Sequence, residues 1–62
     1  MKVGDLIRDR LQEKIGIVLN VFVQPPSLEY AFEVMMVEYI QEDGSISFAE
    51  AIDTEVINEE HR

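Results

Sequence analysis

The stretch YAFEVMMVEYI, residues 30–40, decides the fold of this chain. It combines aromatic, β-branched and long apolar residues, which are the residues enriched in β-strands. Read with a period of two, Phe32, Val34 and Met36 fall on one side of a strand, and Glu33 and Met35 fall on the other. We expect this segment to be the central strand of a sheet, pairing along both edges and covering a small core.

The alternation within this run is not perfect. Glu38 would follow Val34 onto the apolar side, whereas Val37 and Tyr39 fit that side only if the phase slips by one residue. A β-bulge restores such a phase, so we predict one near residues 35–37. Methionine adapts to irregular neighbours, and residues 35–37 are therefore open to two interpretations: an exposed self-association patch or part of the core.

Two further strands follow from local signals on either side. The run Gly16–Val23 is dense in β-branched residues, and two prolines at 25–26 end it because proline cannot donate to a ladder. Asp43-Gly44 predicts a tight turn, and the alternating residues 45–48 beyond it complete a hairpin. In that last strand we expect Ile46 and Phe48 to point the same way.

The ends of the domain are shorter. Residues 49–52 suit a single helical or 3₁₀ turn, residues 55–57 suit one closing strand, and residues 58–62 form a charged tail. Residues 5–14 are ambiguous. Either Asp5 caps a helix with apolar residues every four positions (Ile7, Leu11, Ile15), or it belongs to a turn that leads into a strand over 6–10 and a loop. Periodicity alone does not decide between them.

Composition narrows the classes of function. The chain has 62 residues, no cysteine and a net charge of −8, which predicts one small domain without disulfides. The charge is +1 over residues 1–24 and −9 over residues 25–62, so we expect no direct nucleic-acid binding. The longest nearly apolar run, residues 15–23, is far short of a membrane span of about 20 residues. We expect a soluble, cytoplasmic protein.

Catalytic groups are scarce. His61 is the single histidine, and paired carboxylates occur as Glu42-Asp43 in a turn and Glu59-Glu60 in the tail. A hydrolytic carboxylate pair needs an apolar cleft, and a metal centre needs several ligands. We therefore expect a protein that is not an enzyme, with no metal and no cofactor.

The order of these signals resembles the SH3-like small barrel. The segments VGDLIR, IGIVLNV, FEVMMVEYI, DG, ISF and EVI match its five short strands with a helical turn before the last. The opening Gly4-Asp5 and the run Gly16-Ile17-Val18 are similar to the start of KOW and Tudor-type barrels, and the whole resembles short tailed-bacteriophage proteins. The resemblance implies an all-β, SH3-like five-stranded barrel over residues 1–57, a phage-encoded chain in the host cytoplasm, and a strand at 6–10.

Size, charge and this resemblance together predict a non-enzymatic protein-interaction or structural module. It would bind a protein partner or associate with itself, for example as a homodimer. Tudor-type barrels hold cations in aromatic cages, so the candidate protein-binding residues are Tyr30, Phe32 and Tyr39 with the acidic Glu29 and Glu38. The competing interpretation is that the aromatic residues, Phe22 and Phe48 included, fill the core. An alternative function is an acidic mimic of nucleic acid that inhibits a basic host enzyme.

Overall fold

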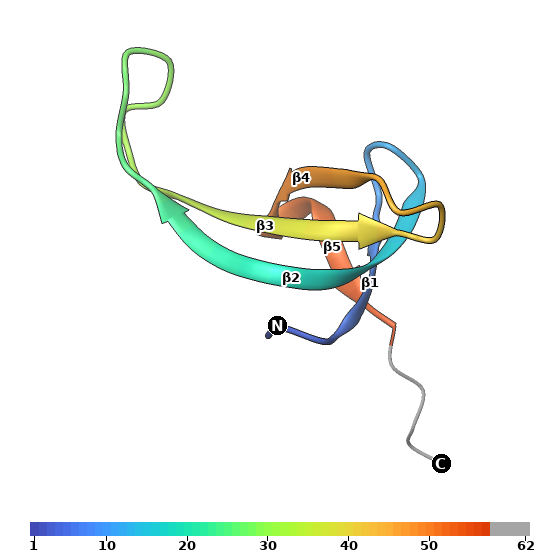
Figure 1. The fold of residues 1–62 in the computed structure, drawn as a ribbon. Helices are drawn as coiled ribbons and strands as arrows, with labels where there is room; N and C mark the ends of the chain where they lie inside the picture. The colour runs from blue at the N-terminus through green and yellow to red at the C-terminus, as the bar shows by residue number, and fades with distance from the viewer. Residues whose placement is uncertain (58–62) are drawn as a thin grey trace.

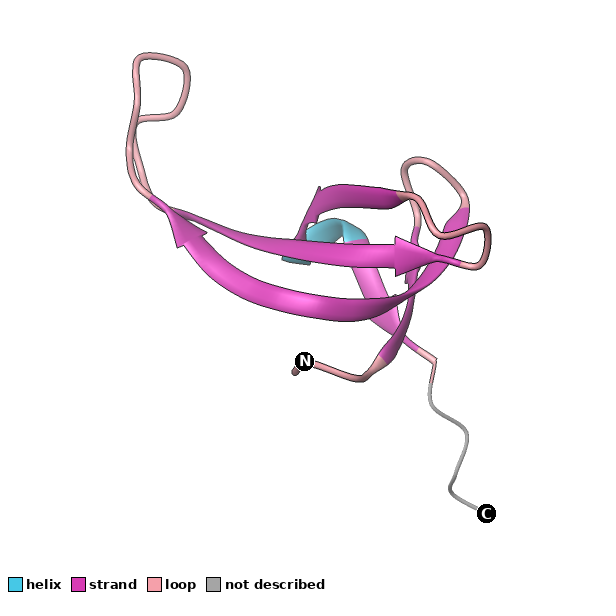
Figure 2. Ribbon diagram, viewed as in Figure 1, coloured by secondary structure: helices cyan, strands magenta, loops and turns pink. Residues whose placement is uncertain are grey.

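The computed structural model describes residues 1–57, and these form five antiparallel strands and one short 3₁₀ turn (Figures 1 and 2). The predicted charged tail, residues 58–62, lies outside the described residues. In chain order the elements are β1 (Leu6–Asp9), β2 (Lys14–Gln24), β3 (Val34–Gln41), β4 (Ile46–Glu50), η1 (Ala51–Asp53) and β5 (Thr54–Val56). The all-β class is confirmed. A helical turn and a short closing strand follow as predicted, but the turn begins at Ala51 rather than at 49, since 49 and 50 belong to β4, and the strand spans 54–56 rather than 55–57.

The strands make one sheet in the order β4-β3-β2-β1-β5, which leaves β4 and β5 as its two edges. The sheet is strongly curved, and β4, η1 and β5 lie on the same side of the long β2–β3 hairpin (Figure 1). The turn η1 contacts both β3 and β5. The result is a curled, open five-stranded sheet with one concave face.

The N-terminal ambiguity is resolved in favour of a strand. Residues 6–9 pair with both β2 and β5, and the chain then turns through Glu13, whose φ is 58°. A helix would have placed Ile7, Leu11 and Ile15 on one buried stripe. Instead Ile7 is buried, whereas Leu11 is 73% exposed and Ile15 is 51% exposed.

The central strand is real but shorter than predicted. β3 pairs with β2 on one edge and β4 on the other, yet it begins at Val34, so residues 30–33 belong to the preceding loop rather than to the strand. The prolines explain the late start, because β2 cannot continue past Gln24 and β3 has no partner before that point.

A β-bulge is present, but it lies in β2 and not at residues 35–37, where it was predicted. The register shifts between Val18 and Asn20 of β2, and β3 pairs without interruption with β4. An extra residue in the longest, most curved strand increases its bend and its twist. Glu38 therefore stays on the face opposite Val37 and Tyr39.

The concave face holds the core. Ile7, Val18, Val37 and Tyr39 are buried together, and Val21, Ala49 and Ala51 pack against them. Of the five aromatic residues expected to fill the core, only Tyr39 does so. Phe22 and Phe48 lie on the other face as an edge-to-face pair with ring centroids 6.3 Å apart, and Tyr30 and Phe32 lie in the loop before β3.

The hairpin of β3 and β4 forms as predicted. Gly44 has a φ of 91°, a conformation that glycine adopts without steric cost. The amide of Gly44 donates to the carbonyl oxygen of Gln41, and the amide of Gln41 donates to the carbonyl oxygen of Ser45. Ile46 and Phe48 point the same way, toward the convex face, and both are about half exposed.

Candidate functional site

An apolar row crosses the convex face of the sheet. Leu6 on β1 lies opposite Ile17 on β2, Ile17 lies opposite Ile40 on β3, and Ile40 lies opposite Ile46 on β4. Directly opposed residues share one face of a sheet and contact one another. We call these four residues the apolar row.

The apolar row is accessible. Ile17 is 39% exposed and Ile46 is 50% exposed, while Leu6 and Ile40 are half-buried. Beside it the surface is hollowed by about 380 Å³, and the lining is mainly apolar: Leu6, Ile15, Gly16, Ile17, Ile40, Gln41 and Glu42. A contiguous exposed apolar face is a feature found at protein interaction sites.

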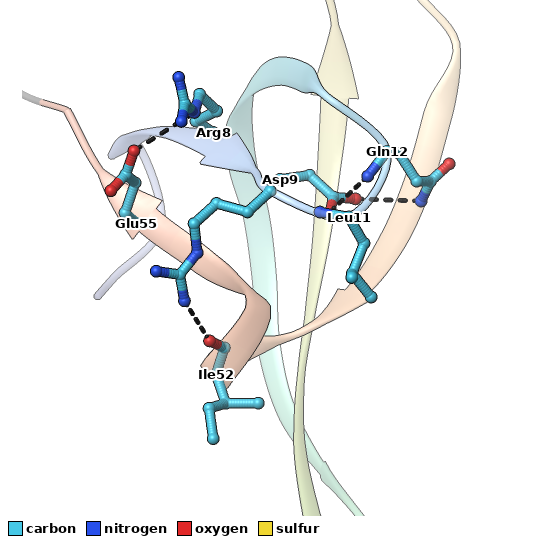
Figure 3. A network of polar contacts seen from close by, with 7 residues as sticks. Arg8, Asp9, Leu11, Gln12, Ile52 and Glu55 are labelled. Carbon is cyan, nitrogen blue, oxygen red and sulfur yellow. Dashed lines mark hydrogen bonds and ion pairs between the residues drawn. The ribbon is translucent and has the colours of Figure 1, made fainter.

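A buried carboxylate lies at the end of β1, on the side of the sheet opposite the apolar row. Asp9 is 1% exposed, and its Oδ1 accepts hydrogen bonds from the amides of Leu11 and Gln12 at 3.0 and 3.2 Å. Its Oδ2 accepts from the Gln12 side-chain amide at 3.0 Å and from the Tyr39 hydroxyl at 2.8 Å. Figure 3 shows Asp9 turned toward Leu11 and Gln12. Four donors thus satisfy the carboxylate, and its role is to hold the β1–β2 turn against the core.

Two contacts tie β1 and its turn to the C-terminal elements (Figure 3). Arg10 donates from Nη2 to the carbonyl oxygen of Ile52 at 2.6 Å. Arg8 and Glu55 form an exposed ion pair at 3.3 Å, which contributes little to stability by itself. Both contacts flank the backbone ladder between β1 and β5, and that ladder places β5 at the edge of the sheet.

The Tyr39 hydroxyl makes the stability of the fold depend on pH in the alkaline range. Burial raises the pKa of Tyr39 from 10.0 to about 12, and both the hydrogen bond to Asp9 and the negative charge of Asp9 act in the same direction. The folded state therefore favours the neutral phenol, and this contribution is complete below pH 10 and lost as the pH rises through 12. At 1.36 kcal/mol per unit, and allowing for solvent screening, the loss is about 2 kcal/mol.

We expect the free energy of unfolding of the native chain to fall between pH 10 and 12. In a Tyr30→Phe background, phenolate absorbance reports Tyr39 alone, and it should appear only above the pH at which a free tyrosine ionises. A Tyr39→Phe chain lacks the group and should show a flatter profile over the same interval. Ionisation of Tyr39 at the free value would contradict the buried hydrogen bond.

The residues predicted for protein binding are not brought together. Tyr39 is completely buried on the concave side, and Glu38 lies on the convex side of the same strand. Glu29, Tyr30 and Phe32 lie in the loop before β3, where the Ser27 hydroxyl accepts hydrogen bonds from the amides of Glu29 and Tyr30. Phe32 is 65% exposed. The three aromatic rings therefore do not line one cage.

The apolar row was missed by sequence reasoning because its members come from four strands. The alternation of Ile46 with Ser47 predicts that the two side chains lie on opposite sides of their strand. Which of these sides faces the core depends on the other strands. The methionine patch is also divided: Met35 is 47% exposed on the concave side, whereas Val37 beside it is buried and Met36 faces the other way.

Two further observations concern metal binding and membrane-spanning helices. Within residues 1–57, no three histidine, aspartate or glutamate side chains gather closely enough to hold a metal ion. The described part of the chain also contains no helix with the length and apolar character needed to cross a membrane.

Comparison with known proteins finds no matching family model, no matching curated sequence and no matching solved structure.

Proposed function

We propose that this chain is a non-enzymatic protein-interaction module on an SH3-like barrel, and that its apolar row is covered by a second copy of the chain. The five antiparallel strands and the 3₁₀ turn before the last one support the SH3-like assignment. The resemblance to short phage proteins is the ground for proposing a phage-encoded chain that acts in the host cytoplasm.

The imbalance between exposed and buried apolar side chains carries this proposal. Among residues 1–57, four hydrophobic side chains are buried and fifteen large hydrophobic side chains are exposed. A domain this small derives little stability from its own core, and association commonly supplements it. Covering the apolar row would remove from water the hollow of about 380 Å³ beside it.

The row suits a two-fold contact because its residues are alike from end to end. When two copies meet face to face in opposite directions, Leu6 of one lies near Ile46 of the other, and Ile17 lies near Ile40. Arg8, which is paired across the sheet with Ile15, would then approach Glu42 of the other copy. Such an isologous contact closes at two copies.

We expect the native chain to dimerise and the double variant Ile17→Glu/Ile46→Glu to stay monomeric. Burying two carboxylates in an apolar contact is strongly unfavourable, so the dimer should weaken by at least about a hundredfold. Sedimentation velocity over a concentration series measures this. The control Leu11→Glu/Leu28→Glu adds the same charge at exposed positions outside the row, and it should still dimerise.

Salt separates this proposal from the acidic-mimic alternative. Two copies of charge −8 repel one another, so the dimer should strengthen as salt screens the repulsion, whereas a mimic would lose its basic enzyme. A folded native chain that is monomeric at every concentration would overturn the proposal. So would a row variant that dimerises like the control.

A further inference from the structure

A second surface lies where the β2–β3 hairpin extends beyond the rest of the sheet (Figure 1). β4 pairs with β3 only as far as Glu50, which lies opposite Met36. β3 begins two residues earlier, at Val34, and there it pairs with β2 alone. The edge of β3 that faces away from β2 is therefore not covered by β4 at Val34 and Met35.

A hollow of about 220 Å³ lies at this edge, and we call it the arm hollow. It is lined by Phe32, Glu33, Val34, Met35, Glu50 and Ile52. Three of these side chains are largely open: Phe32 is 65% exposed, Met35 is 47% exposed and Ile52 is 75% exposed. The arm hollow thus joins apolar walls to two carboxylates.

The two carboxylates have no cation of their own in the described chain. Residues 25–57 contain no lysine, arginine or histidine. The ion pairs within residues 1–57 are Lys2–Asp5 and Arg8–Glu55, and neither involves Glu33 or Glu50. The chain therefore presents an uncompensated negative charge beside an exposed apolar wall.

We propose that the arm hollow binds an extended segment of a protein partner in which lysine or arginine alternates with apolar residues. The segment lies beside Val34 and Met35 as an added strand, so that its main chain pairs with the uncovered edge. Its apolar side chains cover Met35 and Ile52, and its cations reach Glu33 and Glu50.

The alternation follows from strand geometry. Successive side chains of an extended segment point to opposite sides, so one set can meet Met35 on the concave side while the other meets Glu50, which lies opposite Met36 on the convex side. A lysine stem also packs along apolar surface with its charge in water, and the face of Phe32 attracts a cation. A nucleic acid would bring phosphates to two carboxylates, which is unfavourable.

The probe is a short, end-capped and labelled peptide of alternating lysine and valine, and fluorescence anisotropy measures its affinity for the full chain. Glu33→Gln/Glu50→Gln should weaken binding about tenfold, because it removes both charge-assisted contacts. The matched control Glu13→Gln/Glu42→Gln removes the same charge outside the arm hollow and should change the affinity by less than about twofold. Far-ultraviolet circular dichroism establishes that every variant is folded.

Two comparisons test the apolar part. Met35→Ser should weaken binding, and Leu28→Ser, at a fully exposed loop position, should not. A peptide of alternating lysine and glycine should bind more weakly than the lysine–valine peptide. The proposal is overturned if the lysine–valine peptide does not bind, if both charge variants lose affinity equally, or if the glycine peptide binds as tightly.

This inference stands apart from dimerisation through the apolar row. The variant Ile17→Glu/Ile46→Glu leaves the lining of the arm hollow unchanged, so it should bind the lysine–valine peptide with the native affinity while it fails to dimerise. A peptide that binds the native chain but not this variant would place the binding site on the row and overturn the proposal.

Discussion

Replacing Asp9 with leucine is expected to lower the free energy of unfolding by about 3 to 4 kcal/mol, because it leaves buried donors without their acceptor. The total stability expected for 62 residues is only about 3 to 9 kcal/mol. The substitution should therefore remove a large share of the stability of the chain, although leucine has the same branched shape as aspartate and leaves no large cavity.

The loss has two sources. The Tyr39 hydroxyl is buried and donates to Asp9 at 2.8 Å, and without that acceptor an unsatisfied buried donor costs about 1 to 3 kcal/mol. The amides of Leu11 and Gln12 also lose their acceptor, which resembles the removal of a helix cap at about 1 kcal/mol. These two amides can reach water, so their share is the smaller one.

Urea unfolding followed by circular dichroism measures the effect, and the double variant Asp9→Leu/Tyr39→Phe is its control. Removing both members of a buried hydrogen bond is far less costly than removing one. The double variant should therefore be more stable than Asp9→Leu alone. If Asp9→Leu leaves the unfolding midpoint unchanged, the carboxylate does not hold the turn to the core.

Asp9 shows why parts of this structure are not predictable from local sequence. It stands between Arg8 and Arg10, a setting that indicates a solvated charge, and its main partner Tyr39 lies 30 positions away. By contrast, the hairpin at Asp43-Gly44 depends on residues close together in sequence, and it was predicted correctly.

The same reasoning explains the faces of the sheet. The strands were recognisable from composition, but their inward sides depend on the bulge between Val18 and Asn20. Without a bulge in β3, Val37 and Tyr39 share the inner side with Met35, whereas the predicted bulge would have put them with Val34 and Met36. Tyr39 was expected in a binding surface because of the resemblance to Tudor-type cages, and the apolar row was not foreseen because its members come from four strands.

Gly16 is the position where the bend of the sheet has no room for a side chain. A Cβ added there would lie 2.5 Å from the carbonyl oxygen of Ile40 and 2.5 Å from Cδ2 of Tyr39. Such overpacking commonly costs 1 to 3 kcal/mol, and here we expect about 3 kcal/mol for Gly16→Ala because neither neighbour can move freely. The Tyr39 ring is fixed by its bond to Asp9.

Ile40 is held more firmly still, since it is paired with Ile17 on one side and Ile46 on the other. Gly44→Ala is the matched control: nothing lies within 4 Å of its added Cβ, and only its φ of 91° is unfavourable, at about 1 kcal/mol. Thermal and urea unfolding should rank native above Gly44→Ala and Gly44→Ala above Gly16→Ala. The reverse order would mean that the ring of Tyr39 does not lie over Gly16, and that the line of contact from this glycine through Tyr39 to Asp9 does not organise the core.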